Sequence, residues 1–350
     1  MNPSVTASEI EENALTVIIP AYNEADSIAD TIRSLQAQTR IPAAIVVIDD
    51  CSTDGTAAIA SALGVTVVRP PANTGSKAGA QMFALAGVKT AMVMALDADT
   101  TLAPDAIELL LPAFEDPEVV AACGTVLPRR VESIWERGRY IEYLLAFGFF
   151  KRVQDYYGKP LISSGCFSIY RTGELCALGG WSTRTMAEDM DLTWRIYGAG
   201  GKVRFCPAAV SYPIEPRDFA FMSKQLRRWS HGFVQNVRLH GRSLLGLGFL
   251  RSTVAIAFWD ALVASIAYLV LIPVLALAFD PLFLLGYLVD APVVMVPVLW
   301  QAFERREARL ALASMPSFFV LRIVNSVFML RALWDELVVH RPLLVYEKGH

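Results

Sequence analysis

Residues 252–303 constrain the fold of this chain more than any other part of its sequence. They include no Lys, Arg or Glu, and their only charged side chains are Asp260, Asp280 and Asp290. A helix of about 20 apolar residues spans the hydrocarbon core of a bilayer. Because the segment is long enough for two such helices with a turn near Asp280, we predict a transmembrane hairpin there. Asp260 and Asp290 lie inside the apolar runs, where an acid is functional, lies near an interface or is paired, here with Arg322.

The sequence on either side of the hairpin gives it an orientation. The N-terminal residues lack the basic start and the apolar core of a secretory signal, so we expect a tail over residues 1–14 and a cytoplasmic location for everything before the hairpin. Residues 305–309 contain three arginines, which the positive-inside rule assigns to the cytoplasm. We therefore predict a multi-pass protein of the cell (inner) membrane. Residues 304–350 would form a cytoplasmic loop, a third apolar helix that crosses the membrane or lies along it, and a tail.

A basic segment precedes the hairpin. Residues 217–251 hold seven Lys or Arg and a single acid, Asp218. Such a segment next to an apolar hairpin suits the anionic face of a membrane, so we predict that it is interfacial and that its partners are lipids rather than nucleic acid. The five cysteines have no metal-type spacing, and we expect reduced thiols.

Short apolar runs alternate with helical patterns in the N-terminal part of the chain. The runs cover residues 15–19, 44–48, 65–68 and 91–96, and the segments between them have the apolar spacing of helices. Strands that alternate with helices form a mostly parallel sheet, because right-handed crossovers place helices on both of its faces. We therefore predict an α/β, Rossmann-like domain over residues 15–216.

Polar side chains follow these runs, at the edge of the predicted sheet where open α/β folds bind ligands. Asp97 and Asp99 come directly after the fourth run. If the strand continues through Asp99, both carboxylates point the same way and can face one divalent cation or sugar hydroxyl. An Asp-rich turn would have the same sequence. Groups of the same kind recur after the other runs, at 22–24, 49–50 and Lys77, which favours a nucleotide, phosphate or metal site over a series of plain turns.

Two later motifs also have functional and structural interpretations. A helix over 187–195 begins with acids, of which Glu188 and Asp191 share a face while Asp189 points elsewhere. One carboxylate could enter a cleft, or all could simply complement the helix dipole. Further on, Gln225, Arg228 and Trp229 recur on one helical face of the basic segment.

Taken in order, these motifs resemble those of the family 2 inverting glycosyltransferases. The set consists of Pro20-Ala-Tyr-Asn-Glu24, Asp49-Asp50 with 52–54, Asp97-Ala-Asp99, Glu188-Asp189 and the Gln225-x-x-Arg228-Trp229 motif. It is similar to the membrane-bound branch of that family, which includes poly-N-acetylglucosamine, chitin, hyaluronan and cellulose synthases. The resemblance covers about residues 15–232, and the hairpin after it also fits this branch.

The resemblance implies a GT-A fold that binds a nucleoside diphosphate sugar with Mg²⁺ or Mn²⁺. It assigns Asp99 to the metal and Asp189 to the general base. It assigns the nucleotide and donor site to Ala21, Tyr22, Glu24, Asp50, Lys77, Asp97 and Arg228. It assigns the acceptor side to Ser164, Gly165, Cys166, Glu188, Gln225 and Trp229.

We therefore expect a membrane-bound inverting glycosyltransferase that uses a UDP-sugar, with UDP-N-acetylglucosamine or UDP-glucose favoured. The acceptor is a glycan, a lipid or a protein, and a homo-oligomer is left open. One alternative is a polyprenyl-phosphate glycosyltransferase that makes a single lipid-linked sugar. An alternative of another class is a catalytically silent membrane scaffold that binds nucleotide sugars. The few predicted membrane helices leave processive polymerisation and single transfer both open.

Overall fold

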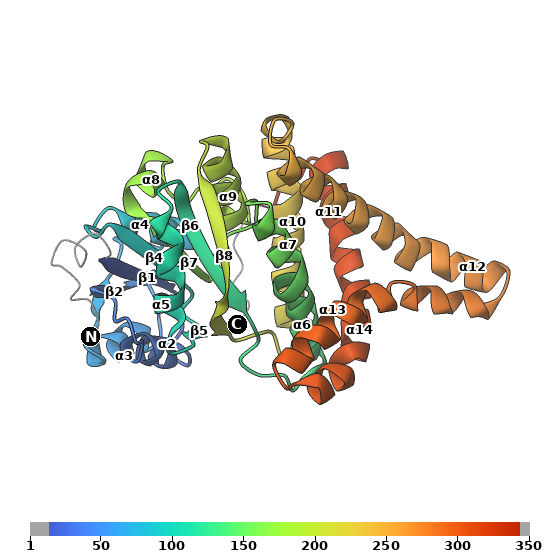
Figure 1. Ribbon diagram of the computed structural model, residues 1–350, viewed down its shortest axis with the longest axis horizontal. Helices are drawn as coiled ribbons and strands as arrows, with labels where there is room; N and C mark the ends of the chain where they lie inside the picture. The colour runs from blue at the N-terminus through green and yellow to red at the C-terminus, as the bar shows by residue number, and fades with distance from the viewer. Residues whose placement is uncertain (1–13, 344–350) are drawn as a thin grey trace. The chain divides into compact units, whose positions relative to one another are not determined.

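The computed structural model describes residues 14–343, which form two units (Figure 1). The described part of the first unit runs to Val126 and also includes 158–184 and 188–214. The second unit consists of 127–157, 185–187 and the described residues from Glu215 onward. The domain predicted over 15–216 thus includes three segments that belong to the second unit, 127–157, 185–187 and 215–216.

The four predicted apolar runs form the parallel half of the sheet in the first unit. They are β1 (Leu15–Ala21), β2 (Ala44–Asp49), β3 (Thr66–Val68) and β4 (Met92–Leu96). β1 pairs in parallel with β2 and β4, and β2 pairs in parallel with β3. The crossover helices between them are α2 (Ile28–Gln36), α3 (Thr56–Ala62) and α4 (Lys77–Leu85). The α/β prediction is therefore confirmed for this half.

The other half of the sheet is mixed. Its strands are β5 (Thr100–Leu102), β6 (Val119–Val126), β7 (Phe167–Arg171) and β8 (Lys202–Pro213), and the whole sheet has the order β3-β2-β1-β4-β7-β6-β8-β5. β7 runs antiparallel to both β4 and β6, whereas β6 and β8 are parallel. Its helices are α5 (Ala106–Leu110), the 3₁₀ turn η1 (Leu111–Glu115), α8 (Thr172–Ala177) and α9 (Glu188–Gly198).

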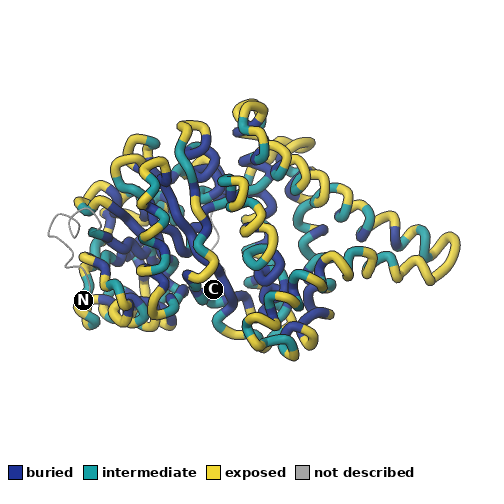
Figure 2. Tube along the Cα trace, viewed as in Figure 1, coloured by how far each residue is buried: buried dark blue, intermediate teal, exposed yellow. Residues whose placement is uncertain are grey.

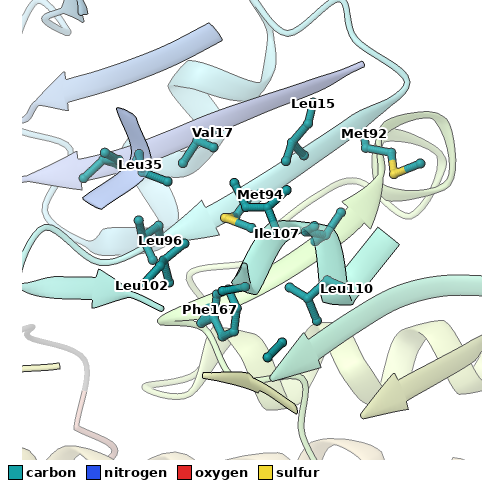
Figure 3. Close-up of a cluster of buried hydrophobic side chains, with 14 of the residues drawn as sticks. Leu15, Val17, Leu35, Met92, Met94, Leu96, Leu102, Ile107, Leu110 and Phe167 are labelled. Carbon is teal, nitrogen blue, oxygen red and sulfur yellow. The ribbon is translucent and has the colours of Figure 1, made fainter. Parts of the chain in front are cut away.

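Alternate side chains of the central strands form the core on one face of the sheet (Figure 3). Val17 of β1 and Met94 of β4 pack with Leu35 of α2 and Ile107 of α5, and all four are buried. Residues i and i+2 of a strand face the same side of the sheet. The apolar side chains on that side therefore pack against the apolar faces of the helices. The core fixes the strands whose carboxyl ends hold the predicted site.

The second unit consists of helices. α6 (Ile134–Leu145) opens with a capping box in which Ser133 and Glu136 bond each other's backbone. It continues through η2 (Ala146–Phe150) and α7 (Lys151–Tyr156), and the unit also contains α10 (Phe219–Leu244). The apolar C-terminal elements are α11 (Phe249–Ile266), η3 (Ala267–Leu271), α12 (Ile272–Ala278), η4 (Pro281–Leu288), α13 (Ala291–Glu304), α14 (Ala308–Leu333) and η5 (Trp334–Val338).

Three helices of the described chain are long and apolar enough to cross a membrane: Phe249–Ala278, Pro281–Glu304 and Ala308–Val338. The first two coincide with the predicted hairpin, few of whose residues are buried (Figure 2). The third has 39% of its most apolar window buried in the protein, against 17% and 11% for the others, because α14 packs on α6, α10 and α11. Both modes predicted for this helix remain open, and the predicted tails at 1–13 and 344–350 lie outside the described residues.

The two acids inside the apolar helices have a partner. Nη2 of Arg322, on α14, lies 2.6 Å from Asp290 Oδ2 and 3.9 Å from Asp260 Oδ1. The Tyr268 hydroxyl also donates to Asp290, at 2.8 Å. Charged side chains in apolar surroundings need such pairing. The paired alternative predicted for these acids is thus the arrangement in the structure.

We expect Arg322→Met to destabilise the protein by about 3–5 kcal/mol, because it leaves Asp290 without its counter-charge in apolar surroundings. Adding Asp290→Asn to the variant should recover most of the loss. Arg331→Met on the same helix is the matched control, since its side chain is 64% exposed. Thermal unfolding in detergent measures all three, and an equal loss in the Arg331 variant would contradict the expectation.

We also expect Gly124→Ala to destabilise the sheet by about 1–3 kcal/mol, because a Cβ at this position in β6 would overlap the Phe167 ring and the Ala209 carbonyl. The same substitution at Gly173, where nothing lies within 4 Å of the added atom, should be close to neutral. Unfolding midpoints of the two variants provide the comparison. Equal midpoints would mean that β6 moves away at little cost.

Candidate active site

The candidate site of the first unit lies where β1, β2 and β4 end. Ala21 is the last residue of β1 and pairs with Asp49, so Tyr22 and Asp50 follow neighbouring strands at the same edge. Asp97 follows β4, which is the other neighbour of β1. The strand ends therefore bring Tyr22, Asp50 and Asp97 to one edge of the sheet, whereas Arg228 of the same predicted set lies on α10 in the second unit.

The loops after β1 and β2 hold each other. The Asn23 N–H donates to Ser52 Oγ at 3.0 Å, and the Glu24 N–H donates to Thr56 Oγ1 at 2.7 Å. Asn23 is left-handed, with φ 54°, a conformation that asparagine tolerates better than most residues. The Glu24 carboxylate accepts a hydrogen bond from Ser27 at 2.8 Å. The polar residues at 52–56 thus shape the first loop.

Asp50 is engaged by the glycine-containing loop that precedes α4. Its Oδ1 accepts the Thr74 N–H at 2.8 Å, its Oδ2 accepts the Thr74 hydroxyl at 2.9 Å, and its backbone carbonyl accepts Asn73 Nδ2 at 2.7 Å. The carboxylate therefore fixes the loop that leads to Lys77. Each carboxylate oxygen has further lone pairs, so contact with a base remains compatible with these bonds.

Lys77 interacts with residues from three parts of the chain. Its ammonium forms an ion pair with Asp97, donates to the Gly165 carbonyl at 3.1 Å and lies 3.9 Å from Glu188 Oε1. The side chain is only 15% exposed. The structure thus joins a predicted donor-side carboxylate to the predicted acceptor-side turn of Ser164, Gly165 and Cys166.

Asp189 is held on the same turn. Its Oδ2 accepts the Gly165 N–H at 2.8 Å, and its Oδ1 accepts the Met190 N–H at 2.8 Å. Burial, with a smaller contribution from Asp97, raises the pKa of the neighbouring Cys166 thiol far above its ordinary value. Cys166 therefore stays a neutral thiol, and its chemistry is that of a small packed side chain rather than a nucleophile.

The three acids at the start of α9 have different partners. Asp191 is buried between Arg184 and Arg195, at 2.6 and 2.9 Å, and so pairs away from the site. Glu188 and Asp189 both reach the site, from the first turn of the helix. The pKa of Glu188 is raised to about 7, mainly by burial; Lys77 opposes this rise, and the charge of Asp189 adds to it.

Asp99 lies in a turn, because β4 ends at Leu96 and β5 begins at Thr100. The strand geometry considered for Asp97 and Asp99 is therefore not present. Asp99 Oδ1 accepts the Thr100 hydroxyl at 3.1 Å. Among residues 14–343, no three His, Cys, Asp or Glu side chains cluster as metal ligands. Two carboxylates one residue apart nevertheless fit a Mg²⁺ or Mn²⁺ ion that takes its other ligands from substrate phosphates and water.

The remaining predicted residues, Gln225, Arg228 and Trp229, belong to α10 in the second unit. The fully buried Arg139 of α6 donates to Gln225 Oε1 at 2.7 Å, and its guanidinium lies 4.3 Å from the centre of the Trp229 ring. Two carboxylates, Glu142 and Glu215, balance its charge. Burial raises the pKa of Glu215, and Arg139 opposes that rise. Sequence analysis missed Arg139, since nothing in its neighbourhood marks it as the residue that positions this motif.

Comparison with known proteins finds a family model that matches part of the chain, and relatives that are similar to it. Residues 16–175 match the model of "Glycosyl transferase family 2". The poly-beta-1,6-N-acetyl-D-glucosamine synthase of Staphylococcus aureus (strain MSSA476) is 29% identical over 235 residues, which are 66% of this chain and 56% of that protein. The enzyme of the same name from Staphylococcus epidermidis is 27% identical over 233 residues, again 56% of its length. This chain thus matches little more than half of each relative.

A solved structure extends the likeness in fold. The mannosyltransferase PcManGT from Pyrobaculum calidifontis, in complex with GDP-Man and Mn²⁺, superposes with a TM-score of 0.62 at 20% identity. The superposition covers 93% of this chain and 87% of that one. The fold of the two proteins is therefore the same, as the sequence predicts.

We expect the raised pKa of Glu188 to give the protein a characteristic pH dependence of stability. In the unfolded chain this group ionises near its ordinary pKa of 4.5, whereas in the folded protein it keeps its proton up to about pH 7. Between those values the unfolded state loses the proton first, so this group's contribution to the free energy of unfolding falls as pH rises and is constant outside the window. The Glu188→Gln variant lacks this loss, so its Tm relative to the unsubstituted protein should rise across the window.

Thermal unfolding in detergent at several pH values measures the difference. Glu174→Gln is the matched control, because Glu174 is exposed on α8 and its substitution should give a curve parallel to that of the unsubstituted protein. A parallel curve for Glu188→Gln as well would contradict the expectation.

Proposed function

We propose that residues 16–175, which match the model of glycosyltransferase family 2, form a catalytic domain of the GT-A fold, and that the whole chain is a membrane-bound, metal-dependent inverting glycosyltransferase. UDP-N-acetylglucosamine is the favoured donor and UDP-glucose the next. The names of the staphylococcal relatives support N-acetylglucosamine. The acceptor is a glycan, a lipid or a protein.

The arrangement of Asp189 and Lys77 on the turn at Gly165 is the observation that supports transfer best. Asp189 accepts the Gly165 N–H, while Lys77 donates to the carbonyl of the same residue and pairs with Asp97. The backbone of Gly165 thus joins a carboxylate that could accept a proton to the lysine and the aspartate proposed for the donor side. A protein that only binds nucleotide sugars needs no such base.

The residues of the site can divide the work of an inverting transfer. Asp50 keeps the loop of Lys77 in place at the nucleotide side, Asp97 would contact the ribose or the sugar of the donor, and Asp99 would hold the divalent cation. When bound, that ion neutralises negative charge on the leaving diphosphate. Asp189 takes the proton of the acceptor hydroxyl, a weak nucleophile until it is deprotonated. Attack from the side opposite the diphosphate then inverts the anomeric carbon.

The second unit supplies the rest of the proposal. Arg228 would add a guanidinium to the diphosphate oxygens, and Gln225 and Trp229, both bound by Arg139, would contact the acceptor. The apolar helices support attachment to a membrane, and the relatives' names fit an enzyme of glycan synthesis. A multi-pass arrangement with a cytoplasmic site follows from the basic residues at 305–309. A homo-oligomer and the number of sugars transferred are left open.

The decisive experiment is UDP release by the detergent-purified protein with Mg²⁺ or Mn²⁺, over a panel of nucleotide sugars, with products sized by mass spectrometry. Metal-dependent release from one donor supports the proposal and names the sugar, and product size separates a polymer from one lipid-linked sugar. UDP binding without release from any donor, with glycan, polyprenyl-phosphate and protein acceptors supplied, would favour the scaffold alternative.

We expect Asp189→Asn to lower kcat by about 100-fold or more, in the range typical of a lost general base, and to leave the Kd for UDP nearly unchanged. Asparagine keeps an oxygen that can accept the Gly165 N–H, so the turn should stay in place. The matched control is Asp30→Asn, the same exchange at a side chain that is 57% exposed on α2. Unchanged turnover in Asp189→Asn would assign the base to another residue.

A further inference from the structure

The three residues before Glu188 are held by α10. Segment 185–187 belongs to the second unit, all three of its residues are buried, and α9 begins at the next residue. Glu188 and Asp189 are therefore the first two residues after this segment. Consecutive Cα atoms are about 3.8 Å apart, so a displacement of Ala187 carries over to both acids.

Two amide side chains of α10 fix the backbone of the segment. Gln235 Oε1 accepts the Met186 N–H at 2.9 Å, and Asn236 Nδ2 donates to the Ala187 carbonyl at 3.1 Å. The same Nδ2 also donates to Thr185 Oγ1 at 3.3 Å and to the Gly232 carbonyl at 2.9 Å. One donor group thus ties the segment at two points, and both side chains are buried.

Gly232, one turn earlier on α10, lets the helix approach segment 185–187 closely. A Cβ at this position would lie 2.7 Å from the Ala187 Cβ and 2.8 Å from its nitrogen. Gly232, Gln235 and Asn236 have the i, i+3, i+4 spacing of one helical face. The face that holds the segment therefore belongs to the helix that also carries Gln225 and Trp229.

The orientation of the Gln235 amide is set from the other side. Its Nε2 donates to Glu336 Oε1 at 2.6 Å and to the Leu343 carbonyl at 3.0 Å. An ionised carboxylate only accepts hydrogen bonds, so the amide nitrogen must face Glu336 and the amide oxygen must face the Met186 N–H. Glu336 is 1% exposed and also accepts the Leu343 N–H at 3.2 Å, with His231 Nδ1 2.9 Å away.

We propose that Gln235 and Asn236 are positioning residues that set the carboxylates of Glu188 and Asp189 through segment 185–187, and that Glu336 sets the orientation of Gln235. The inference rests on the proposed function, because it takes Asp189 as the base. It adds residues to that function which contact neither donor nor acceptor. It also connects the base to η5, at the end of the third apolar helix.

Asn236→Asp tests the proposal with a nearly isosteric change. It replaces the only donor group of the side chain by an oxygen that faces the carbonyls of Ala187 and Gly232. We expect kcat to fall about tenfold or more, since a misplaced catalytic group costs up to about 100-fold, and we expect the Kd for UDP to stay within about twofold. Hydrogen–deuterium exchange in peptides that cover 185–192 should become faster, while exchange in β1, β2 and β4 should not change.

Gln235→Met is the second variant, because it keeps the length of the side chain and loses its hydrogen bonds. The matched control is Gln36→Glu, an amide-to-acid exchange at an exposed side chain of α2, for which kcat and exchange should be those of the unsubstituted protein. Wild-type kcat together with wild-type exchange in both α10 variants would overturn the proposal. So would faster exchange throughout the protein with a lower kcat and a proportionally higher Kd for UDP, since that pattern marks a merely structural role.

Failure of the proposed function would be seen separately. A protein that turns over no donor would refute the transferase, whereas the exchange at 185–192 in the two variants would still decide whether α10 holds the segment. Local protection that is lost in both variants supports that part of the proposal, and unchanged protection overturns it.

Discussion

The candidate site depends on one buried cation. Lys77 is the first residue of α4. Its ammonium contacts the carboxylate of Asp97 and the carbonyl of Gly165, and it lies 3.9 Å from Glu188 Oε1. Without a positive charge there, several acids would share a partly buried edge of the sheet, and repulsion between the carboxylates would favour their protonated, neutral forms. Lys77 thus allows donor-side and base-side acids to lie near one another. Its own placement depends in turn on Asp50, which holds the loop before α4 through both oxygens.

The sequence predicts the part of this site that strand ends determine. Apolar runs mark where β1, β2 and β4 stop, so Asp50 and Asp97 could be assigned to one edge before any coordinates were known. Partners that are distant in sequence could not be found in this way. The pairing of Asp191 with Arg184 and Arg195 depends on how α9 packs, and helical spacing alone could not identify these two partners.

Buried charge is a second limit on prediction from sequence. Arg139 is fully enclosed, although arginine is mostly exposed in proteins. Its role becomes visible only when α6 and α10 are seen together, since it binds Gln225 and Trp229 and is balanced by two glutamates. The mixed half of the sheet was missed for a related reason. Alternating strands and helices describe β1 to β4, whereas β7 is placed beside β4 by pairing over a long separation in sequence.

The ion pair between Asp290 and Arg322 has a consequence for the order in which the chain can assemble. Both residues lie in apolar helices, and Asp290 precedes Arg322 in the chain, so the acid leaves the ribosome first. Arg322 can leave water at low cost only when its counter-charge is already within reach. The hairpin must therefore be formed before α14 packs against it. The ion pair thus makes the docking of α14 depend on the hairpin.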